Sequence, residues 1–216
     1  MGWVKLTAIT SATQFLFGRD DGTNRNYWIE ITNDNGYVSS VNIGTSDTST
    51  VGSVCPVGVW THICSTYDGS NVKVYINGNL DVSESVTGTL DNDDVSFTIG
   101  AREAGIDRHF GGSMSDVKVY SSALTEAEVQ SQYLKPESVP SPSTLVAWYP
   151  MCEGNPDSPQ SIVYDHSEKK LGSELVSGGD MSNLADAGSS GYAFIPSSNW
   201  TYKYSGGSNG SSTQYS

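Results

Sequence analysis

The chain has 216 residues, a formal net charge of −13, and charged side chains at only 16% of its positions. An acidic protein is repelled by duplex DNA and by anionic membranes, so nucleic-acid binding is not expected. No apolar run reaches the roughly 20 residues that a membrane-spanning helix needs, so membrane insertion is not expected either. The many Gly, Ser, Thr and Tyr residues favour an all-β, loop-rich protein over a cytosolic α/β enzyme.

The first half of the chain predicts a series of short β-strands. Two apolar segments come first, at Trp3–Leu6 and Gln14–Phe17. The runs Tyr27–Thr32 and Tyr37–Ile43 follow, separated by an Asn-Gly step. Such a step between two β-rich runs predicts a hairpin with a type I′ turn, because both central residues of that turn need a positive φ.

Two further turn signals lie in the middle of the chain. Asp68-Gly69 predicts a hairpin that joins Trp60–Tyr67 to Asn71–Ile76, and Asn77-Gly78 turns the chain again. The series ends with two more predicted strands, at Val95–Ile99 and Ser113–Tyr120. Many short strands with regular turn signals are typical of a β-sandwich or jelly roll.

One short helix is expected after these strands. Thr125 can cap its N-terminus, and Glu128 stands three residues later, where it completes a capping box. Leu124, Val129 and Tyr133 are placed to attach the helix to the sandwich.

Taken in order, these pieces resemble the laminin-G-like, concanavalin A-like jelly-roll domain in its bacterial and viral form. The resemblance implies that residues 1–134 are an all-β, concanavalin A-like jelly-roll β-sandwich of two antiparallel sheets with one short helix. Such domains mostly bind glycans or proteins, or build surfaces, and a minority of the superfamily cleaves polysaccharides. The matching pieces are Trp3–Lys5, Trp60-x-His62, Thr66–Gly69, Val74–Gly78, Ile99-Gly100 and Gly112–Glu128.

The segment that should open such a domain stands near the end of this chain. Residues 135–144 hold three prolines and predict a linker, and residues 145–167 then resemble the missing first strands. Three arrangements stay open: docking in the same molecule as a circular permutation, completion of a neighbour's sandwich, or the start of a tandem repeat. The C-terminal segment, residues 145–216, ends in a polar stretch at 205–216 that is expected to be flexible.

The three cysteines have neither the spacing of a disulfide framework nor that of a metal site. Cys64 lies within a predicted core strand and is expected to be a small buried apolar residue. A Cys55–Cys64 bridge stays open, because sequence alone does not fix connectivity.

Catalysis is not expected. Glycoside hydrolysis needs two carboxylates that face the scissile bond. The related laminarinases and lichenases carry theirs in a Glu-x-Asp-x-x-Glu motif, which is absent here. The three histidines form no triad and no metal motif with neighbouring residues.

Two kinds of binding site are open. Exposed aromatic rings can stack on sugar rings, whereas Trp3, Trp60 and Trp148 are expected in the core. The glycan-binding candidates are Tyr27, Trp28, Tyr37 and Trp200. Calcium is the candidate cofactor, because it takes several loop oxygens and two acidic loops offer them. The calcium candidates are Asp20, Asp21 and Asn24 in one loop and Asp91, Asp93 and Asp94 in the other, with ordinary solvated turns as the competing explanation.

The leading hypothesis from the sequence is a non-catalytic structural module of a phage virion, as a capsid decoration, fibre or tail-associated protein with an adhesion role. The acidic composition, the lack of a signal-peptide pattern and the displaced segment lead to it. Its partners would be other virion proteins or a second copy, held through residues 145–167. The alternative is a lectin module of a bacterial surface or secreted protein that binds cell-surface glycans, and a glucanase-like hydrolase is third. The expected location is the virion surface or the extracellular space.

Overall fold

A computed structural model describes the backbone of residues 1–34, 36–44, 46–102, 108–151, 164–167, 190–195, 201–206 and 214–215. The chain divides into two compact units, Met1–Asp165 and His166–Ser216. The second unit contains a three-stranded antiparallel sheet of β13 (Ser190–Ile195), β14 (Thr201–Gly206) and β15 (Gln214–Tyr215). The expected flexibility of residues 205–216 stays a prediction.

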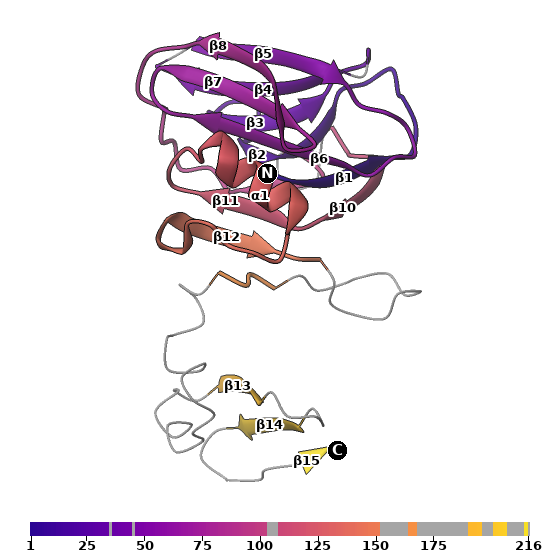
Figure 1. Ribbon diagram of the computed structural model, residues 1–216, viewed down its shortest axis with the longest axis vertical. Coiled ribbons are helices and arrows are strands. Elements are labelled where there is room, and N and C mark those ends of the chain that lie inside the picture. Colours follow the sequence, from indigo (N-terminus) through magenta and orange to yellow (C-terminus); the bar gives the residue numbers. More distant parts are fainter. Residues whose placement is uncertain are drawn as a thin grey trace. The chain divides into compact units, whose positions relative to one another are not determined.

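Two five-stranded antiparallel sheets make up most of the first unit (Figure 1). One sheet has the order β10-β1-β6-β7-β8, and the other has the order β5-β4-β3-β2-β9. These sheets and a single α-helix in the described part of the chain confirm the predicted fold class. The bounds in the first sheet are β10 (Gly112–Ser115), β1 (Gly2–Leu6), β6 (Thr61–Tyr67), β7 (Asn71–Ile76) and β8 (Asn79–Ser85), and those in the second are β5 (Ser46–Val54), β4 (Gly36–Ile43), β3 (Arg25–Ile31), β2 (Gln14–Asp20) and β9 (Thr98–Ile99).

The main core lies between the two sheets. Val4 and Leu6 of β1 and Ile63 of β6 are fully buried there, against Phe17 and Ile29 of the other sheet. Side chains of a strand alternate between its two faces, so Trp3 and His62 lie on the opposite, outer face. Burial of this apolar surface is worth roughly 25 cal/mol per Å² and is the main stabilising contribution.

The two central hairpin turns confirm the prediction. The Asp68 carboxylate accepts hydrogen bonds from the main-chain N–H groups of Ser70 (2.9 Å) and Asn71 (2.7 Å). Asn77 and Gly78 have φ values of +51° and +79°, and the residues that flank them, Ile76 and Asn79, pair with each other. This two-residue turn has positive φ at both central positions, as a type I′ turn requires.

The first hairpin and the edge strands differ from the prediction. Ile31 pairs with Tyr37, so the connection from β3 to β4 is longer than a two-residue turn. The strands β5 and β8 are not apparent in the sequence, because their residues are mostly polar and exposed. Edge strands commonly carry such residues, because an apolar edge would invite pairing with another chain.

Two predicted strands are shorter or interrupted in the structure. Of Val95–Ile99, only β9 is strand. Ser113–Tyr120 is divided at Asp116, whose φ is +54°, into β10 and β11 (Val117–Tyr120).

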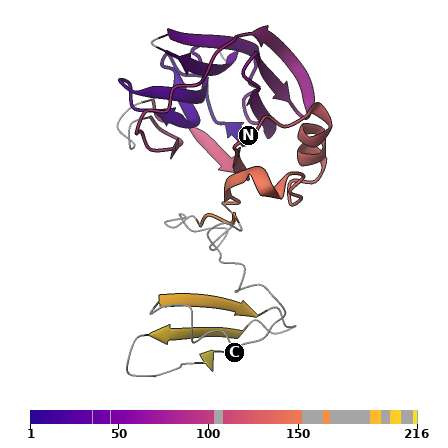
Figure 2. The same ribbon diagram turned by 90° about the vertical axis from the view of Figure 1, so that its left-hand side faces the viewer.

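The helix α1 (Glu126–Leu134) has the predicted capping box. The Thr125 hydroxyl accepts from the main-chain N–H of Glu128 (3.3 Å), and the Glu128 carboxylate accepts from that of Thr125 (2.7 Å). Leu124 and Val129 are buried against the first sheet, and Tyr133 stacks on Trp3 with ring centroids 5.5 Å apart. Figure 2 shows the helix on the outer side of the sandwich.

The displaced segment contributes one more strand to the first unit. After the 3₁₀ helix η2 (Pro142–Thr144), β12 (Leu145–Tyr149) pairs antiparallel with β11 of the same chain. Residues 152–163, which include Cys152 and the rest of the predicted opening strands, lie outside the described residues. The two other arrangements, exchange of this segment with a neighbouring copy and the start of a tandem repeat, stay predictions.

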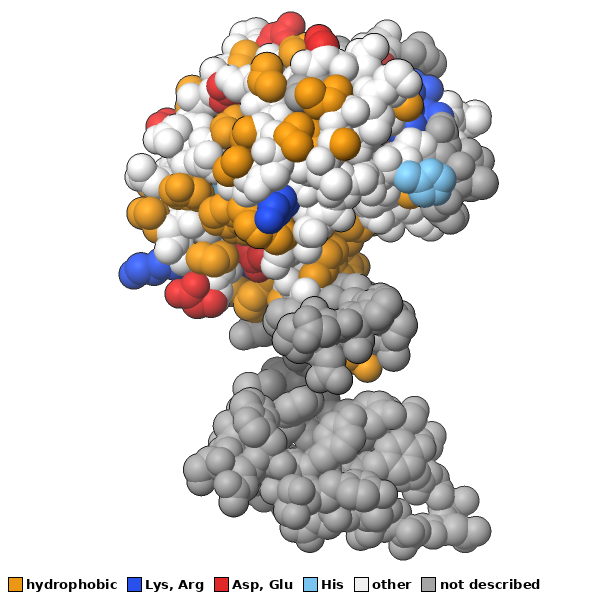
Figure 3. Space-filling model, turned by 90° about the vertical axis from the view of Figure 1, so that its right-hand side faces the viewer, with side chains coloured by type: hydrophobic (Ala, Val, Ile, Leu, Met, Phe, Trp, Pro, Cys, Tyr) orange, Lys and Arg blue, Asp and Glu red, His pale blue; other side chains and the backbone are white. Residues whose placement is uncertain are grey.

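Apolar side chains also occur on the surface of this unit. Figure 3 shows a face on which hydrophobic side chains are scattered among uncharged polar ones, with few charged groups. Trp60 is 42% exposed, so its predicted place in the core is wrong: it lies just before β6 begins and escapes the inward alternation of that strand. Cys55 and Cys64 are both buried and unpaired, which excludes the bridge between them and confirms Cys64 as a core residue.

Candidate functional site

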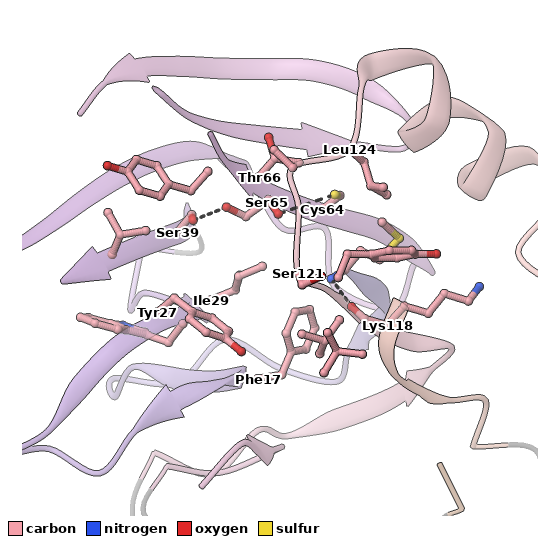
Figure 4. A pocket seen from close by; sticks show the side chains of 18 of the residues that line it. Phe17, Tyr27, Ile29, Ser39, Cys64, Ser65, Thr66, Lys118, Ser121 and Leu124 are labelled. Carbon is pink, nitrogen blue, oxygen red and sulfur yellow. Dashed lines mark hydrogen bonds between the residues drawn. The ribbon is translucent and has the colours of Figure 1, made fainter. Parts of the chain in front are cut away.

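A cavity of about 390 Å³ lies between the two sheets, next to the connection from β11 to α1. Figure 4 shows Phe17, Tyr27 and Ile29 on one side of this space and Ser65 and neighbouring β6 residues on the other. The connection Ser121–Leu124 borders a third side. The cavity is therefore a gap inside the sandwich and not a groove on its outer face.

Apolar side chains and hydroxyl groups share the wall of this cavity. The hydroxyls of Ser39 and Ser65, which come from opposite sheets, hydrogen-bond to each other (Figure 4). Ligand sites in proteins usually combine a mostly apolar wall with a few placed polar groups. The apolar lining includes Phe17, Ile29, Val41, Leu90, Phe97 and Val119, and the hydroxyl-bearing lining includes Tyr27, Thr66, Ser121 and Ser122.

Tyr27 reaches the cavity because β3 alternates. Tyr27 pairs with Val41 of β4, and both side chains belong to the inner cluster that also contains Val72. Burial raises the pKa of the Tyr27 phenol, and the nearby Arg19 guanidinium opposes this in part. The hydroxyl is therefore protonated at neutral pH and can both donate and accept a hydrogen bond.

Met1, which precedes β1, lies beside the cavity. β1 pairs with β6 only as far as Gly2 opposite Ile63. The Met1 main chain then exchanges two hydrogen bonds with Lys118 of β11, at 3.0 and 2.9 Å. Beyond this point β6 continues to Tyr67 and β11 to Tyr120, and in the described part of the chain no strand lies between them.

The cavity carries little charge. Among the residues that the structure describes, no Asp, Glu or Arg lines it. The Lys118 ammonium donates to Asp116 Oδ2 (2.9 Å) and to the Pro136 carbonyl, and the Met1 amino group donates to the Lys118 carbonyl. Both cations are thus occupied, and burial lowers the pKa of the Met1 amino group.

The predicted aromatic candidates divide between the cavity and the core. Tyr27 and Trp28 contribute to the cavity wall, although Trp28 is only 5% exposed. Tyr37 is fully buried in the main core, so the expectation of an exposed ring is wrong for it: β4 is an internal strand and this position faces inward. Trp200 lies outside the described residues. The serine hydroxyls of the cavity have no sequence signal, because serine is common throughout the chain.

The two acidic loops predicted for calcium are joined to each other by arginine. The Arg19 guanidinium donates to Asn92 Oδ1 (3.2 Å) and to the main-chain carbonyls of Asp93 (2.8 Å) and Val95 (2.8 Å). Asp91 accepts from the main-chain N–H of Gly44 at 2.9 Å. The side chains of Asp93 and Asp94 are exposed.

In the first acidic loop the carboxylates already have partners within the protein. Asp20 faces the guanidinium groups of Arg25 (3.6 Å) and Arg102 (3.8 Å). Asp21 accepts hydrogen bonds from the main-chain N–H groups of Thr23 and Asn24 and from the Asn24 side chain, and these bonds lower the pKa of Asp21. Within the described ranges, no three Asp, Glu, His or Cys side chains gather as a metal-binding group. This donor set does not fit calcium, which takes six to eight oxygens.

We therefore expect neither calcium chloride nor EDTA to change the melting temperature. A cation that binds only the folded state would raise it, and chelation would reverse the rise. Differential scanning fluorimetry in both solutions checks this, with magnesium chloride as the control for ionic strength. A rise of the melting temperature that calcium alone causes and EDTA reverses would contradict this prediction and would show that the two loops bind calcium.

A family model of the concanavalin A-like lectin/glucanases superfamily matches residues 2–130 of the chain. The chain belongs to this superfamily. The match confirms, at the level of the superfamily, the resemblance predicted from residues 2–134. Among the described residues, no helix is long and apolar enough to cross a membrane.

Several solved structures resemble this superfamily member. A proposed carbohydrate-binding protein from Bacteroides ovatus ATCC 8483 is 19% identical, with a TM-score of 0.60 over 76% of this chain and 48% of that chain, and shows the shared fold. Domain 4 of AbnA, a GH43 extracellular arabinanase from Geobacillus stearothermophilus, in complex with arabinotriose, is 27% identical over 60% of this chain and 62% of that one, with a TM-score of 0.43. The CBM40 of the Ruminococcus gnavus IT-sialidase, bound to α2,6 sialyllactose, is 20% identical over 60% of this chain and 79% of that chain, with a TM-score of 0.48.

The chain spans only about half of the Bacteroides protein, 48% of its length. No curated protein matches the chain in sequence.

Proposed function

We propose that this protein is a non-catalytic carbohydrate-binding module and that the cavity between the sheets is its saccharide site. The lining of the cavity carries this proposal. A sugar ring has apolar C–H faces and a rim of hydroxyls. The wall offers Phe17, Ile29 and Val41 for the faces, and Tyr27 and Ser121 for the rim. Membership of a superfamily of lectins and glucanases supports the same class of ligand.

Binding without hydrolysis follows from the charges of the site. A glycosidase places two carboxylates about 5–10 Å apart across the scissile bond. In the part of the chain that the structure describes, no carboxylate lines the cavity. We therefore expect no hydrolysis of β-glucans, and release of reducing sugar would contradict this part of the proposal.

The lectin alternative is favoured over the virion role that the sequence suggested. The superfamily match and the Bacteroides protein concern carbohydrate binding, and no comparison points to a phage virion. The capsid-decoration, fibre and tail hypotheses therefore have no support beyond composition. A carbohydrate-binding module works at a cell surface or outside the cell, and this is the location that we propose.

Replacement of Tyr27 tests the saccharide site. On a glycan the wild type binds, Tyr27→Phe is expected to lower affinity about three- to tenfold, because one hydrogen bond contributes about 0.5–1.5 kcal/mol. Tyr27→Ala, which also removes the ring, is expected to lower it further. A glycan array identifies the ligand, and isothermal titration calorimetry measures the affinities.

The matched control is Tyr133→Phe, because Tyr133 stacks on Trp3 outside the cavity lining. This variant is expected to bind like the wild type. Melting temperatures show whether each variant is folded. An array without any ligand, or equal affinities for folded Tyr27 variants and wild type, would contradict the proposed site.

A further inference from the structure

Several hydroxyl groups that border the cavity already bind within the protein. The hydroxyls of Ser39 and Ser65 hydrogen-bond to each other across the two sheets, as Figure 4 shows. The Tyr67 hydroxyl donates to a main-chain carbonyl at 2.7 Å, and the Ser121 hydroxyl donates to another at 3.3 Å. A hydroxyl carries one proton, so a hydroxyl that already donates can only accept from a ligand. The cavity therefore offers a ligand fewer donors than its number of hydroxyl groups suggests.

Tyr27 places a hydroxyl donor next to apolar side chains. Within the described part of the chain, no residue accepts a hydrogen bond from its phenol. Tyr27 packs in one cluster with Val41 and Leu90, and all three border the cavity. Phe17 and Ile29, which are almost fully buried, border it from the same sheet. This side of the cavity therefore combines one donor with a group of apolar side chains.

The charge of the protein favours an uncharged ligand. The net charge of −13 repels acidic sugars such as sialic and uronic acids. The side chain of Lys118 borders the cavity, but its ammonium group donates to the Asp116 carboxylate at 2.9 Å and to the Pro136 carbonyl. The ligand is therefore expected to be a neutral sugar.

We propose that the cavity prefers a neutral 6-deoxyhexose, a sugar with a methyl group at C6 in place of a hydroxymethyl group. The inference rests on the proposed saccharide site and names its class of ligand. Tyr27 donates to a ring hydroxyl, and the C6 methyl group packs against Phe17, Ile29 and Val41. A C6 hydroxyl among these side chains would lose its water without gaining a partner, whereas a methyl group has no hydrogen bond to lose.

Two pairs of simple sugars test this preference. Methyl α-L-fucoside and methyl α-L-galactoside differ only in the C6 hydroxyl, and so do methyl α-L-rhamnoside and methyl α-L-mannoside. Isothermal titration calorimetry with the full chain measures all four affinities. In at least one pair the deoxy sugar is expected to bind about ten- to a hundredfold more tightly, the range over which an apolar pocket distinguishes ligands that differ by one hydroxyl. The methyl glycoside of N-acetylneuraminic acid, a charged probe, is expected to bind more weakly than that deoxy sugar.

Val41→Thr tests the apolar wall. Threonine has nearly the shape of valine but adds a hydroxyl, so the C6 hydroxyl of the sugar gains a partner. The affinity ratio within the preferred pair is expected to fall about threefold or more. Val51→Thr is the matched control, because Val51 is 59% exposed and lies outside the cavity lining, and it should keep the wild-type ratio. Melting temperatures show whether each variant is folded, and the wild-type sugar pairs decide the preference even where Val41→Thr does not fold.

The outcomes separate this inference from the proposed function. Equal affinities within both pairs, or tighter binding of the hydroxylated sugars, would overturn the preference while the saccharide site stands. Tighter binding of the charged probe, or a glycan array whose ligands all lack a deoxy sugar, would do the same. An unchanged ratio in folded Val41→Thr would overturn the placement of the methyl group. An array without any ligand would instead contradict the proposed function itself.

Discussion

Replacing Asp116 by alanine is expected to lower the free energy of unfolding by about 3–5 kcal/mol, the effect of leaving a buried charge without its partner. The Lys118 side chain is fully buried and donates to the Asp116 carboxylate at 2.9 Å. Desolvation lowers the pKa of Lys118 and raises that of Asp116, so each charge depends on the other. Without the carboxylate, Lys118 keeps the Pro136 carbonyl, the face of the Trp148 ring and the charge of Glu137.

The same carboxylate also holds β12 against β11. Asp116 Oδ1 accepts from the Trp148 indole N–H at 2.7 Å, and the Asp116 main-chain N–H donates to the Pro150 carbonyl at 3.1 Å. Removal of the carboxylate breaks only the bond from the indole, and the main-chain bond to Pro150 remains, so β12 is expected to loosen at Trp148. Asp116→Asn, which keeps the shape and one acceptor for the indole, is expected to cost less than Asp116→Ala.

Guanidinium-induced unfolding followed by tryptophan fluorescence measures these changes. Asp94→Ala is the matched control, because Asp94 is exposed and its loss is expected to change stability by no more than about 0.5 kcal/mol. Adding Lys118→Met to Asp116→Asn should restore much of the loss, since the pair is then replaced by neutral groups. A midpoint for Asp116→Ala equal to that of Asp94→Ala would show that the pair contributes nothing.

Lowering the pH from 7 to 5 is expected to reduce the free energy of unfolding by about 2 kcal/mol through His62 alone. His62 is 1% exposed and lies between the rings of Trp3 (5.4 Å) and Tyr133 (6.1 Å). Burial, assisted by the Met1 ammonium and by Lys118, lowers the pKa of His62 to about 3.

The direction of this pH effect follows from how His62 is protonated in the folded and in the unfolded protein. Below its ordinary pKa of about 6.5, the unfolded chain protonates His62 while the folded protein does not. Protons therefore favour unfolding, and stability is lost as the pH falls from 6.5 toward 3. Each pH unit in that window lowers the free energy of unfolding by about 1.36 kcal/mol. The roughly 1.5 units between pH 6.5 and pH 5 therefore lower it by about 2 kcal/mol.

Chemical unfolding at pH 7 and pH 5 isolates this contribution. His62→Gln, which cannot be protonated, is expected to lose about 2 kcal/mol less than the wild type between these two pH values. His109→Gln, at an exposed position, is measured beside it as the control for replacing a histidine by glutamine. Equal pH dependence of His62→Gln and wild type would mean that His62 is protonated as readily in the folded protein as in the unfolded chain.

Local chemistry explains which predictions succeeded. The Asn77-Gly78 turn and the Thr125–Glu128 capping box depend on residues close together in the chain, so the sequence contains all that they require. The strands β5 and β8 lacked a signal because edge strands bury few side chains. Trp60 follows the family pattern but lies one residue outside β6, and a one-residue boundary decides whether a ring faces the core.

From the amino-acid sequence alone we could predict the superfamily, the order of most strands and the capped helix, and could see that the Glu-x-Asp-x-x-Glu motif is absent. The three-dimensional fold was needed to show that Arg19 joins the two acidic loops, that Asp116, Lys118 and Trp148 form one cluster, and that a cavity lies between the two sheets. These features bring together residues that are distant in the chain. They form only when the strands pack together, and no local propensity sets which distant residues then meet.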